Sequence, residues 1–111
     1  MNNTLEEKIL NIIDNKKGFD VKVIDVHEKT ILADKFIIVS GTSSTHVKSL
    51  SDNIEEDLKK EGTYAVKIEG HREGRWILMD YSEIIVHIFH PEERLIYNIE
   101  DLWENVMQKL G

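Results

Sequence analysis

The sequence contains no cysteine, only one proline and no long hydrophobic run. Without cysteine, disulfide frameworks, thiolate metal sites and a cysteine nucleophile are all excluded, and the composition fits a reducing cytoplasm. The apolar runs are far shorter than the roughly 20 residues that a membrane-spanning helix needs. The amino terminus is polar and acidic, unlike a signal peptide. We therefore expect a cytoplasmic protein with no membrane segment.

Basic residues are scarce relative to acidic ones. The chain has 14 Lys and Arg against 21 Asp and Glu, so its formal net charge is −7. Proteins that bind phosphates of nucleic acid more often carry a basic surplus, so direct nucleic-acid readout is disfavoured and basic protein partners are favoured. Apolar residues make up 41% and charged residues 32%, which is typical of a globular protein. The 111 residues have room for one domain, residues 1–111.

Hydrophobic spacing predicts one α/β sandwich with the order helix, strand, strand, helix, three strands and helix. Helices are predicted at residues 4–15, with Thr4 and Glu7 as a capping box, and from the 41–44 turn to Gly62. Strands are predicted at residues 19–26, 36–39, 64–68, 75–81 and 84–89. A helix separates the strands at 36–39 and 64–68, so these two can pair in parallel. Hairpins join the last three strands, which makes the expected sheet mixed.

The carboxy-terminal part is predicted to be helical. Pro91 ends the last strand, residues 92–95 are predicted to form one helical turn, and Asn98 is predicted to cap a final helix. The apolar residues of that helix are Ile99, Leu102, Trp103, Val106 and Leu110.

The strand at residues 75–81 has large apolar residues on both faces. Its period of two places Trp76, Leu78 and Asp80 on one face, and Ile77, Met79 and Tyr81 on the other. Two interpretations stay open from this spacing. The strand is either central and covered on both faces, or it leaves one face free for a partner with its aromatic residues as anchors.

The Gly41-Thr42-Ser43-Ser44 turn lies between a strand and a helix, where backbone N–H groups can hold a phosphate. Ser and Thr at this place are more often ordinary helix caps. An alternative function is a nucleotidyltransferase-like enzyme that uses this turn and Asp80. Such an enzyme needs carboxylates grouped on neighbouring strand ends to hold Mg²⁺, and residues 64–68 contain no Asp-x-Asp pair.

The five histidines do not predict a metal site or a cofactor. His87 and His90 are three residues apart on a strand, so they point to opposite faces. The others, His27, His46 and His71, are scattered over loops and a helix start. We expect His87 to lie in or beside the core, with a hydrogen bond to a neighbour such as Asp80 or Tyr97.

Arg94 and Tyr97 also allow two interpretations. Arg94 can pair with Glu100 or Glu69 and lock the last helix onto the sheet, with Leu102 and Trp103 packed into the core. Alternatively, Arg94 and Tyr97 take part in binding a partner.

Three motifs in the second half of the chain resemble the ribosomal silencing factor family, also called the Iojap family. They are a W-x-x-x-D-Y strand beginning at Trp76, an H-x-F strand end beginning at His87, and an R-x-x-Y-x-x-E-x-L-W tail beginning at Arg94. Upstream, Ala33-Asp34-Lys35-Phe36, Ser40-Gly41-Thr42-Ser43 and Glu69-Gly70 fit the same pattern. The resemblance extends over about residues 4–108.

The resemblance implies a nucleotidyltransferase-like α/β domain that has lost catalysis, with a single mixed five-stranded sheet and flanking helices. It implies binding to the large ribosomal subunit through its ribosomal protein number fourteen. It also implies that this binding blocks the small subunit and represses translation, and that the free protein is a homodimer. Together with the strand pattern, it favours Trp76, Leu78 and Tyr81 as anchors of the contact. Asp80, His87, Arg94 and Tyr97 are expected to orient or flank them.

Overall fold

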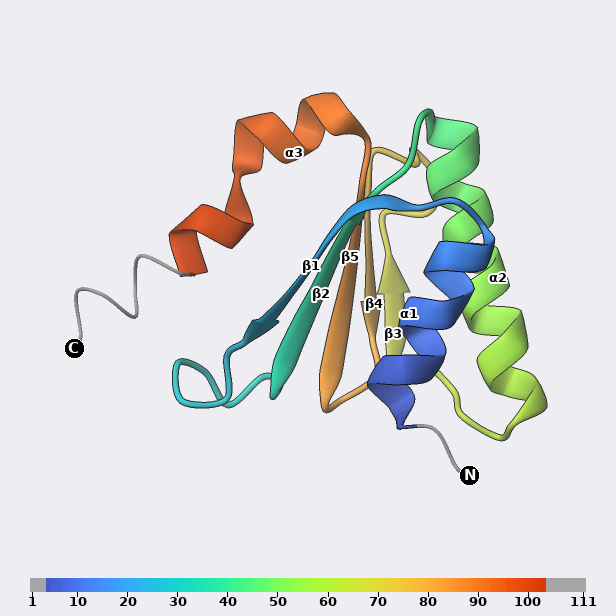
Figure 1. The fold of residues 1–111 in the computed structure, drawn as a ribbon, viewed down its shortest axis with the longest axis vertical. Helices are drawn as coiled ribbons and strands as arrows, with labels where there is room; N and C mark the ends of the chain where they lie inside the picture. The colour runs from blue at the N-terminus through green and yellow to red at the C-terminus, as the bar shows by residue number, and fades with distance from the viewer. Residues whose placement is uncertain (1–3, 104–111) are drawn as a thin grey trace.

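The chain folds into helices and strands in the order that the sequence predicts (Figure 1). The computed structural model describes residues 4–103. Its elements are α1 (Leu5–Asn15), β1 (Phe19–Asp25), β2 (Lys35–Ser40), α2 (Ser44–Lys60), β3 (Lys67–Glu69), β4 (Trp76–Asp80), β5 (Ile84–Phe89) and α3 (Pro91–Tyr97). A further helical turn follows at residues 99–103.

Both long helices begin beside the residues that the sequence marks as caps. The Thr4 hydroxyl accepts a hydrogen bond from the Glu7 N–H at 3.2 Å, and the Ser43 hydroxyl accepts one from the His46 N–H at 3.1 Å. Each bond satisfies a backbone donor that the first helical turn leaves free. These local bonds fix where α1 and α2 start, and the apolar stripe of each helix then faces the sheet.

The sheet has five strands in the order β1-β2-β5-β4-β3. β2 and β5 are parallel and all other neighbouring pairs are antiparallel, so the predicted mixed sheet is confirmed. The prediction that residues 64–68 form the parallel partner of β2 is wrong, because β5 takes that place and β3 forms an edge. The physical reason is burial. All six residues of β5 are buried, which requires neighbours on both sides, whereas β3 has three residues and exposes two.

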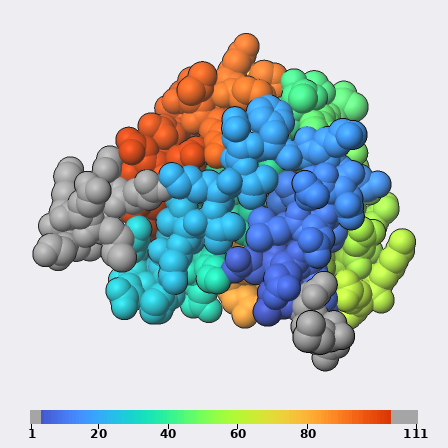
Figure 2. All heavy atoms as spheres, viewed as in Figure 1, coloured from blue at the N-terminus to red at the C-terminus, as the bar shows by residue number. Residues whose placement is uncertain are grey.

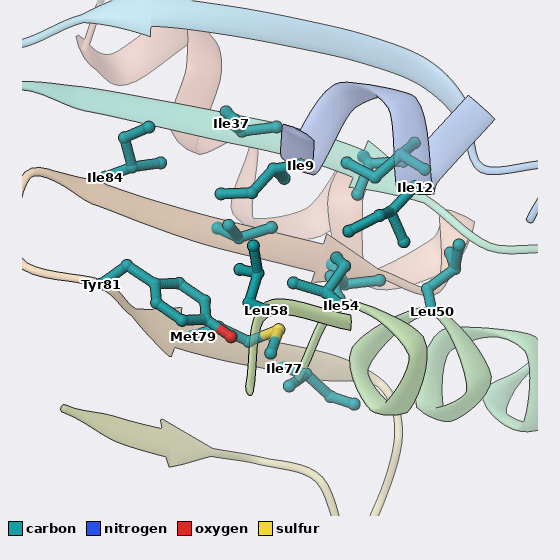
Figure 3. Close-up of a cluster of buried hydrophobic side chains, with 14 of the residues drawn as sticks. Ile9, Ile12, Ile37, Leu50, Ile54, Leu58, Ile77, Met79, Tyr81 and Ile84 are labelled. Atoms are coloured by element: carbon teal, nitrogen blue, oxygen red, sulfur yellow. The ribbon is translucent and has the colours of Figure 1, made fainter. Parts of the chain in front are cut away.

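The two faces of the sheet are covered unequally. α1 and α2 lie side by side on one face (Figure 1) and close the larger hydrophobic cluster. In Figure 3, Ile9 of α1 and Ile54 of α2 point toward Ile37 and Ile77 of the sheet. On the other face, the second cluster contains residues of β1, β2 and β5 and of the loop after β1, and the 99–103 turn packs against it. β4 only borders this second cluster, so its side of that face stays partly open.

The two edges of the sheet are β1 and β3. Figure 2 shows β1 at the surface beside α1. The register of β1 against β2 shifts between Phe19 and Lys22, and Asp20 within this irregularity has a positive φ of 51°. A bulge of this kind bends an edge strand and interrupts its pairing. Part of β1 therefore turns away from the regular sheet near α3.

The carboxy-terminal helices differ from the prediction in two respects. α3 extends to Tyr97, beyond the single turn predicted at residues 92–95, and Asn98 ends it in a left-handed conformation with φ of 43°. Leu102 was expected in the core, but its side chain is 59% exposed, whereas Trp103 packs against the second cluster as predicted. Because the 99–103 turn packs against the second cluster with one side only, Leu102 and Trp103 do not both face inward. Val106 and Leu110 lie outside the described residues.

Two glycines with nearly the same φ angle provide a matched test of the hairpin before β4. Gly70 has φ of 81°, and a Cβ there would lie 2.0 Å from the Trp76 carbonyl oxygen; Gly62 has φ of 82° and open space around it. We expect Gly62→Ala to cost about 1 kcal/mol, the strain of a left-handed residue. We expect Gly70→Ala to cost at least twice that, because β4 must also move. Urea unfolding of both variants measures the difference, and equal losses would contradict this account of the hairpin.

Candidate docking surface

Four side chains form a partly exposed surface on the sheet face that lacks α1 and α2. Trp76, Leu78 and Asp80 of β4 are all half-buried there, and Tyr97 at the end of α3 is 51% exposed. We call these four residues the open surface. Burial alternates along β4: Ile77 and Met79 are fully buried beneath the helices, whereas the opposite face is only partly buried, so the strand is not covered equally on both faces.

The centre of the open surface is a stack of aromatic rings. The Trp76 ring lies over Phe89, with centroids 5.0 Å apart and planes inclined by 26°. Tyr97 approaches the same indole, with centroids 4.8 Å apart and planes inclined by 45°. Such offset pairs add to the free energy gained by burying the rings. They also join α3 to β4, so that two elements far apart in the sequence present one aromatic surface.

His87 lies directly behind this stack. It is opposite Leu78 in the β4–β5 ladder, its side chain is buried, and Trp76 Nε1 donates a hydrogen bond to His87 Nδ1 at 3.1 Å. The prediction that His87 lies in the core is confirmed, but its partner is Trp76 and neither Asp80 nor Tyr97. Since an indole nitrogen can only donate, Nδ1 must be the acceptor and the proton of the neutral ring is on Nε2. Burial lowers the pKa of His87 to about 4, which keeps this ring neutral near pH 7.

Arg94 ties the carboxy-terminal turns to the sheet. Its guanidinium donates two hydrogen bonds to the Glu100 carboxylate, at 2.7 Å and 3.0 Å, and a third to the Ser40 hydroxyl at 2.8 Å. Of the two partners predicted for Arg94, Glu100 is therefore the one it contacts. The hydrogen bonds from Arg94 lower the pKa of the Glu100 carboxyl. Arg94 thus braces the backbone on both sides of Tyr97 and does not itself belong to the open surface.

A second arginine holds the start of α3. Arg75 contacts Glu93 at 2.9 Å and Glu92 at 3.2 Å. No residue of α3 is fully buried, so this helix is attached by ion pairs and by the Tyr97 ring rather than by a core of its own. Half-exposed pairs of this kind contribute little stability individually but fix an orientation when several act together.

Tyr81 does not reach the open surface. Its side chain is 5% exposed and lies in the cluster beneath α1 and α2, as Figure 3 shows, because it shares the parity of Ile77 and Met79. Burial raises the pKa of Tyr81 to about 12, with a smaller contribution from Glu55. The prediction of Tyr81 as an anchor beside Trp76 and Leu78 is therefore corrected. Asp80 remains on the surface, where its carboxylate accepts a hydrogen bond from the Ser82 N–H at 2.8 Å.

The turn at residues 41–44 and Asp80, which the alternative enzyme hypothesis combines, lie far apart in the structure. The Ser43 hydroxyl caps α2, and the Thr42 N–H donates to His46 Nδ1 at 2.8 Å. The Ser43 hydroxyl and the Thr42 N–H therefore already have partners within the protein. Gly41 follows the end of β2 next to Phe89, whereas Asp80 pairs with Ile85 at the other end of β5. Over residues 4–103, no three histidine or acidic side chains gather as a metal site requires. Neither does any helix in this range have the length and hydrophobicity to cross a membrane.

Sequence reasoning missed an apolar strip on α3. Leu95 is 83% exposed, and Ile96 is also exposed. Leu95 lines one wall of a groove of about 580 Å³ between α3 and the irregular start of β1, where Phe19 and Val21 form the other wall. The available signal was the run Leu95-Ile96-Tyr97, because three consecutive large apolar residues of a helix cannot all face one sheet.

The fold is a five-stranded α/β sandwich, and the β4 side of one sheet face carries a partly exposed aromatic surface. The chain belongs to the ribosomal silencing factor family: the model of the family described as "Ribosomal silencing factor during starvation" matches residues 2–110. The predicted resemblance is thereby confirmed.

Relatives and a solved structure agree with this membership. The chain is 36% identical to the ribosomal silencing factor RsfS of Haemophilus influenzae, covering 89% of this chain and 97% of the relative. It is 29% identical to the mouse protein named "Mitochondrial assembly of ribosomal large subunit protein 1", covering 87% of this chain and 44% of the relative. A crystal structure of a Chromobacterium violaceum protein superposes with a TM-score of 0.87 at 32% identity, covering 90% of this chain and 83% of that one.

The buried His87 makes the stability of the protein depend on pH. Because its pKa is about 4 in the folded state against 6.5 for a free side chain, the unfolded state binds the proton first as the pH falls. The contribution of neutral His87 to the free energy of unfolding is fully present above about pH 6.5. It is lost as the pH falls toward about 4, by about 3 kcal/mol in total. We expect His87→Asn to remove this part of the acid loss. His71→Asn, at an exposed ring, should retain it because His87 is still present.

Urea unfolding at about pH 7.5 and about pH 4.5 measures the effect. An acid loss as large in His87→Asn as in the wild type would show that His87 does not cause it.

Proposed function

We propose that this protein binds the large ribosomal subunit with its open surface, through ribosomal protein number fourteen, and thereby keeps the small subunit from joining. Translation is repressed because the surface needed for joining is covered. No substrate is transformed in this mechanism. The single observation that carries the proposal is the contact between half-buried Trp76 and exposed Tyr97 on a sheet face that no long helix covers.

Family membership supports the ribosome as the place of action. The family description names silencing of ribosomes, and the mouse relative is named for assembly of the large subunit. We also propose that the protein is cytoplasmic, as the sequence and its similarity to the bacterial ribosomal silencing factors suggest. The choice of ribosomal protein number fourteen rests on the resemblance, and the aromatic side chains of the open surface support a contact with a protein.

The shape of the open surface supports binding without a large conformational change. Tryptophan and tyrosine are the side chains most often found at the centre of protein interfaces, where they contribute large contact areas. Here Trp76 is already held by neighbouring rings and by a hydrogen bond, and Tyr97 is held by the Trp76 ring, so little side-chain freedom is lost on docking. Leu78 adds an apolar contact beside Trp76, and Asp80 adds a carboxylate at the far end of β4.

The remaining predicted residues act indirectly in this proposal. His87 and Arg94 lie behind the open surface and orient Trp76 and Tyr97, and Tyr81 has no part in the contact. The net charge of −7 complements the basic surface typical of a ribosomal protein, which accelerates encounter and makes it sensitive to salt. We also propose that the free protein is a homodimer, as the resemblance implies.

Two exposed tyrosines at different places allow a matched test of the contact. Tyr97 belongs to the open surface, whereas Tyr64 precedes β3 and is 65% exposed beyond the Asp80 end of β4. We expect Tyr97→Ala to weaken binding to isolated large subunits at least about tenfold, the scale of a central aromatic contact. Tyr64→Ala should stay within about twofold of the wild type, because a few central residues carry most of the binding energy of an interface.

Sedimentation of the labelled protein with large subunits measures both affinities. If Tyr64→Ala weakened binding as much as Tyr97→Ala did, the contact surface would lie elsewhere.

The mechanism of occlusion predicts competition with the small subunit. Excess wild-type protein, added to separated subunits, should reduce the fraction of joined ribosomes in a sucrose gradient, and Tyr97→Ala should require about tenfold more protein for the same effect. Ribosomes that are already joined should not bind the protein. Joining that is unaffected by a saturating excess of wild-type protein would refute the proposed function.

A further inference from the structure

The hydrogen bond between Trp76 and His87 is the only polar contact of the buried imidazole within residues 4–103. Trp76 Nε1 donates to His87 Nδ1 at 3.1 Å, while His87 Nε2 is buried and has no partner among the described residues. The imidazole otherwise touches rings. Phe36 of β2 meets it edge-on, with centroids 4.8 Å apart, and Phe89 lies parallel to it at 6.3 Å.

Packing alone does not explain a histidine at this position. A buried N–H without an acceptor destabilises a folded protein, and an apolar side chain would fill the same space between Phe36 and Phe89 without that cost. The acceptor on Nδ1 is the one property of His87 that an apolar residue cannot supply. This acceptor binds the N–H of the Trp76 indole, which lies in the centre of the open surface.

The indole has three contacts that together define its orientation. Phe89 supports one face, Tyr97 approaches it from α3, and His87 fixes the direction of the N–H. The two ring contacts permit the indole to slide or turn over, because stacking depends weakly on rotation within the plane. A hydrogen bond depends steeply on angle and so excludes those alternatives.

We propose that His87 is a positioning residue of the open surface: its Nδ1 holds the Trp76 indole in one orientation, against which Tyr97 stacks and a partner docks. The part of this inference that concerns the partner rests on the proposed function. His87 itself is buried and does not touch the partner. Its neutral state, which the lowered pKa maintains, is the state that can accept the indole N–H.

Two substitutions separate the acceptor from the bulk of the side chain. His87→Leu keeps an apolar group between the phenylalanine rings but removes the acceptor. His87→Asn is smaller, but it places a carbonyl oxygen where Nδ1 was and so restores an acceptor for Trp76. A third variant, Trp76→Phe, removes the N–H donor while keeping a ring on the surface, so His87 has nothing left to position. Thermal unfolding of all variants establishes that each is folded at the assay temperature.

The first measurement uses the free protein. The indole N–H resonances of Trp76 and Trp103 are recorded by ¹⁵N–¹H NMR, with Trp103 as the internal reference. We expect His87→Leu to shift the Trp76 resonance upfield and to broaden it, and His87→Asn to return it toward the wild-type position. A Trp76 resonance that His87→Leu leaves unchanged overturns the inference, whatever the result for the ribosome.

The second measurement is binding to isolated large subunits. We expect His87→Leu to weaken binding about tenfold, His87→Asn to bind within about threefold of the wild type, and His87→Leu to have no further effect in a Trp76→Phe background. Equal weakening by His87→Leu in both backgrounds overturns the inference, because His87 would then act other than through Trp76. If the wild-type protein does not bind large subunits, the proposed function fails, and the NMR result alone decides whether His87 positions Trp76.

Discussion

The burial of β5 on both faces is the constraint on which the rest of the structure depends. Its six side chains need strands on either side and cover above and below, so β2 and β4 flank it and the other elements are arranged around this centre. Two long helices cover most of one face. The other face is closed only where the second cluster lies, over β1, β2 and β5. The open surface is the remainder, and it is placed on β4 because β4 is the first strand beyond that cover.

The open surface gains its order from contacts that contain little buried apolar area. α3 has no fully buried residue, yet Arg75 and Arg94 fix its two ends and the Tyr97 ring rests against Trp76. Such an arrangement fixes the orientation of apolar side chains that stay partly exposed. This suits docking to a partner, whereas exposed apolar area does not stabilise the free protein. The chain belongs to the ribosomal silencing factor family, and for this reason we propose that the surface contacts the ribosome.

The same architecture argues against chemistry at the strand–helix turn. Hydrogen bonds within the protein engage the Thr42 N–H, the Ser43 hydroxyl and the His46 N–H at the start of α2, and Asp80 lies at the opposite end of the sheet. The turn works as an ordinary helix cap, and the acidic residue fixes a β-turn through Ser82. The turn at residues 41–44 and Asp80, which suggest nucleotide transfer in the sequence, therefore both have structural roles in this chain.

The sequence by itself determined the elements whose signals are local. The caps Thr4 and Ser43, the helical stripes and the alternation of β4 follow from propensity and periodicity, which act over a few residues. It also carried the family resemblance and the burial of His87. Only the tertiary structure decided that β5 pairs with β2, that Trp76 is the partner of His87 and that Arg94 binds Glu100. It also decided that Tyr81, expected at the surface, is buried and that Leu102, expected in the core, is exposed. Each of these depends on which distant segments become neighbours, and competition for burial across the whole chain settles that choice.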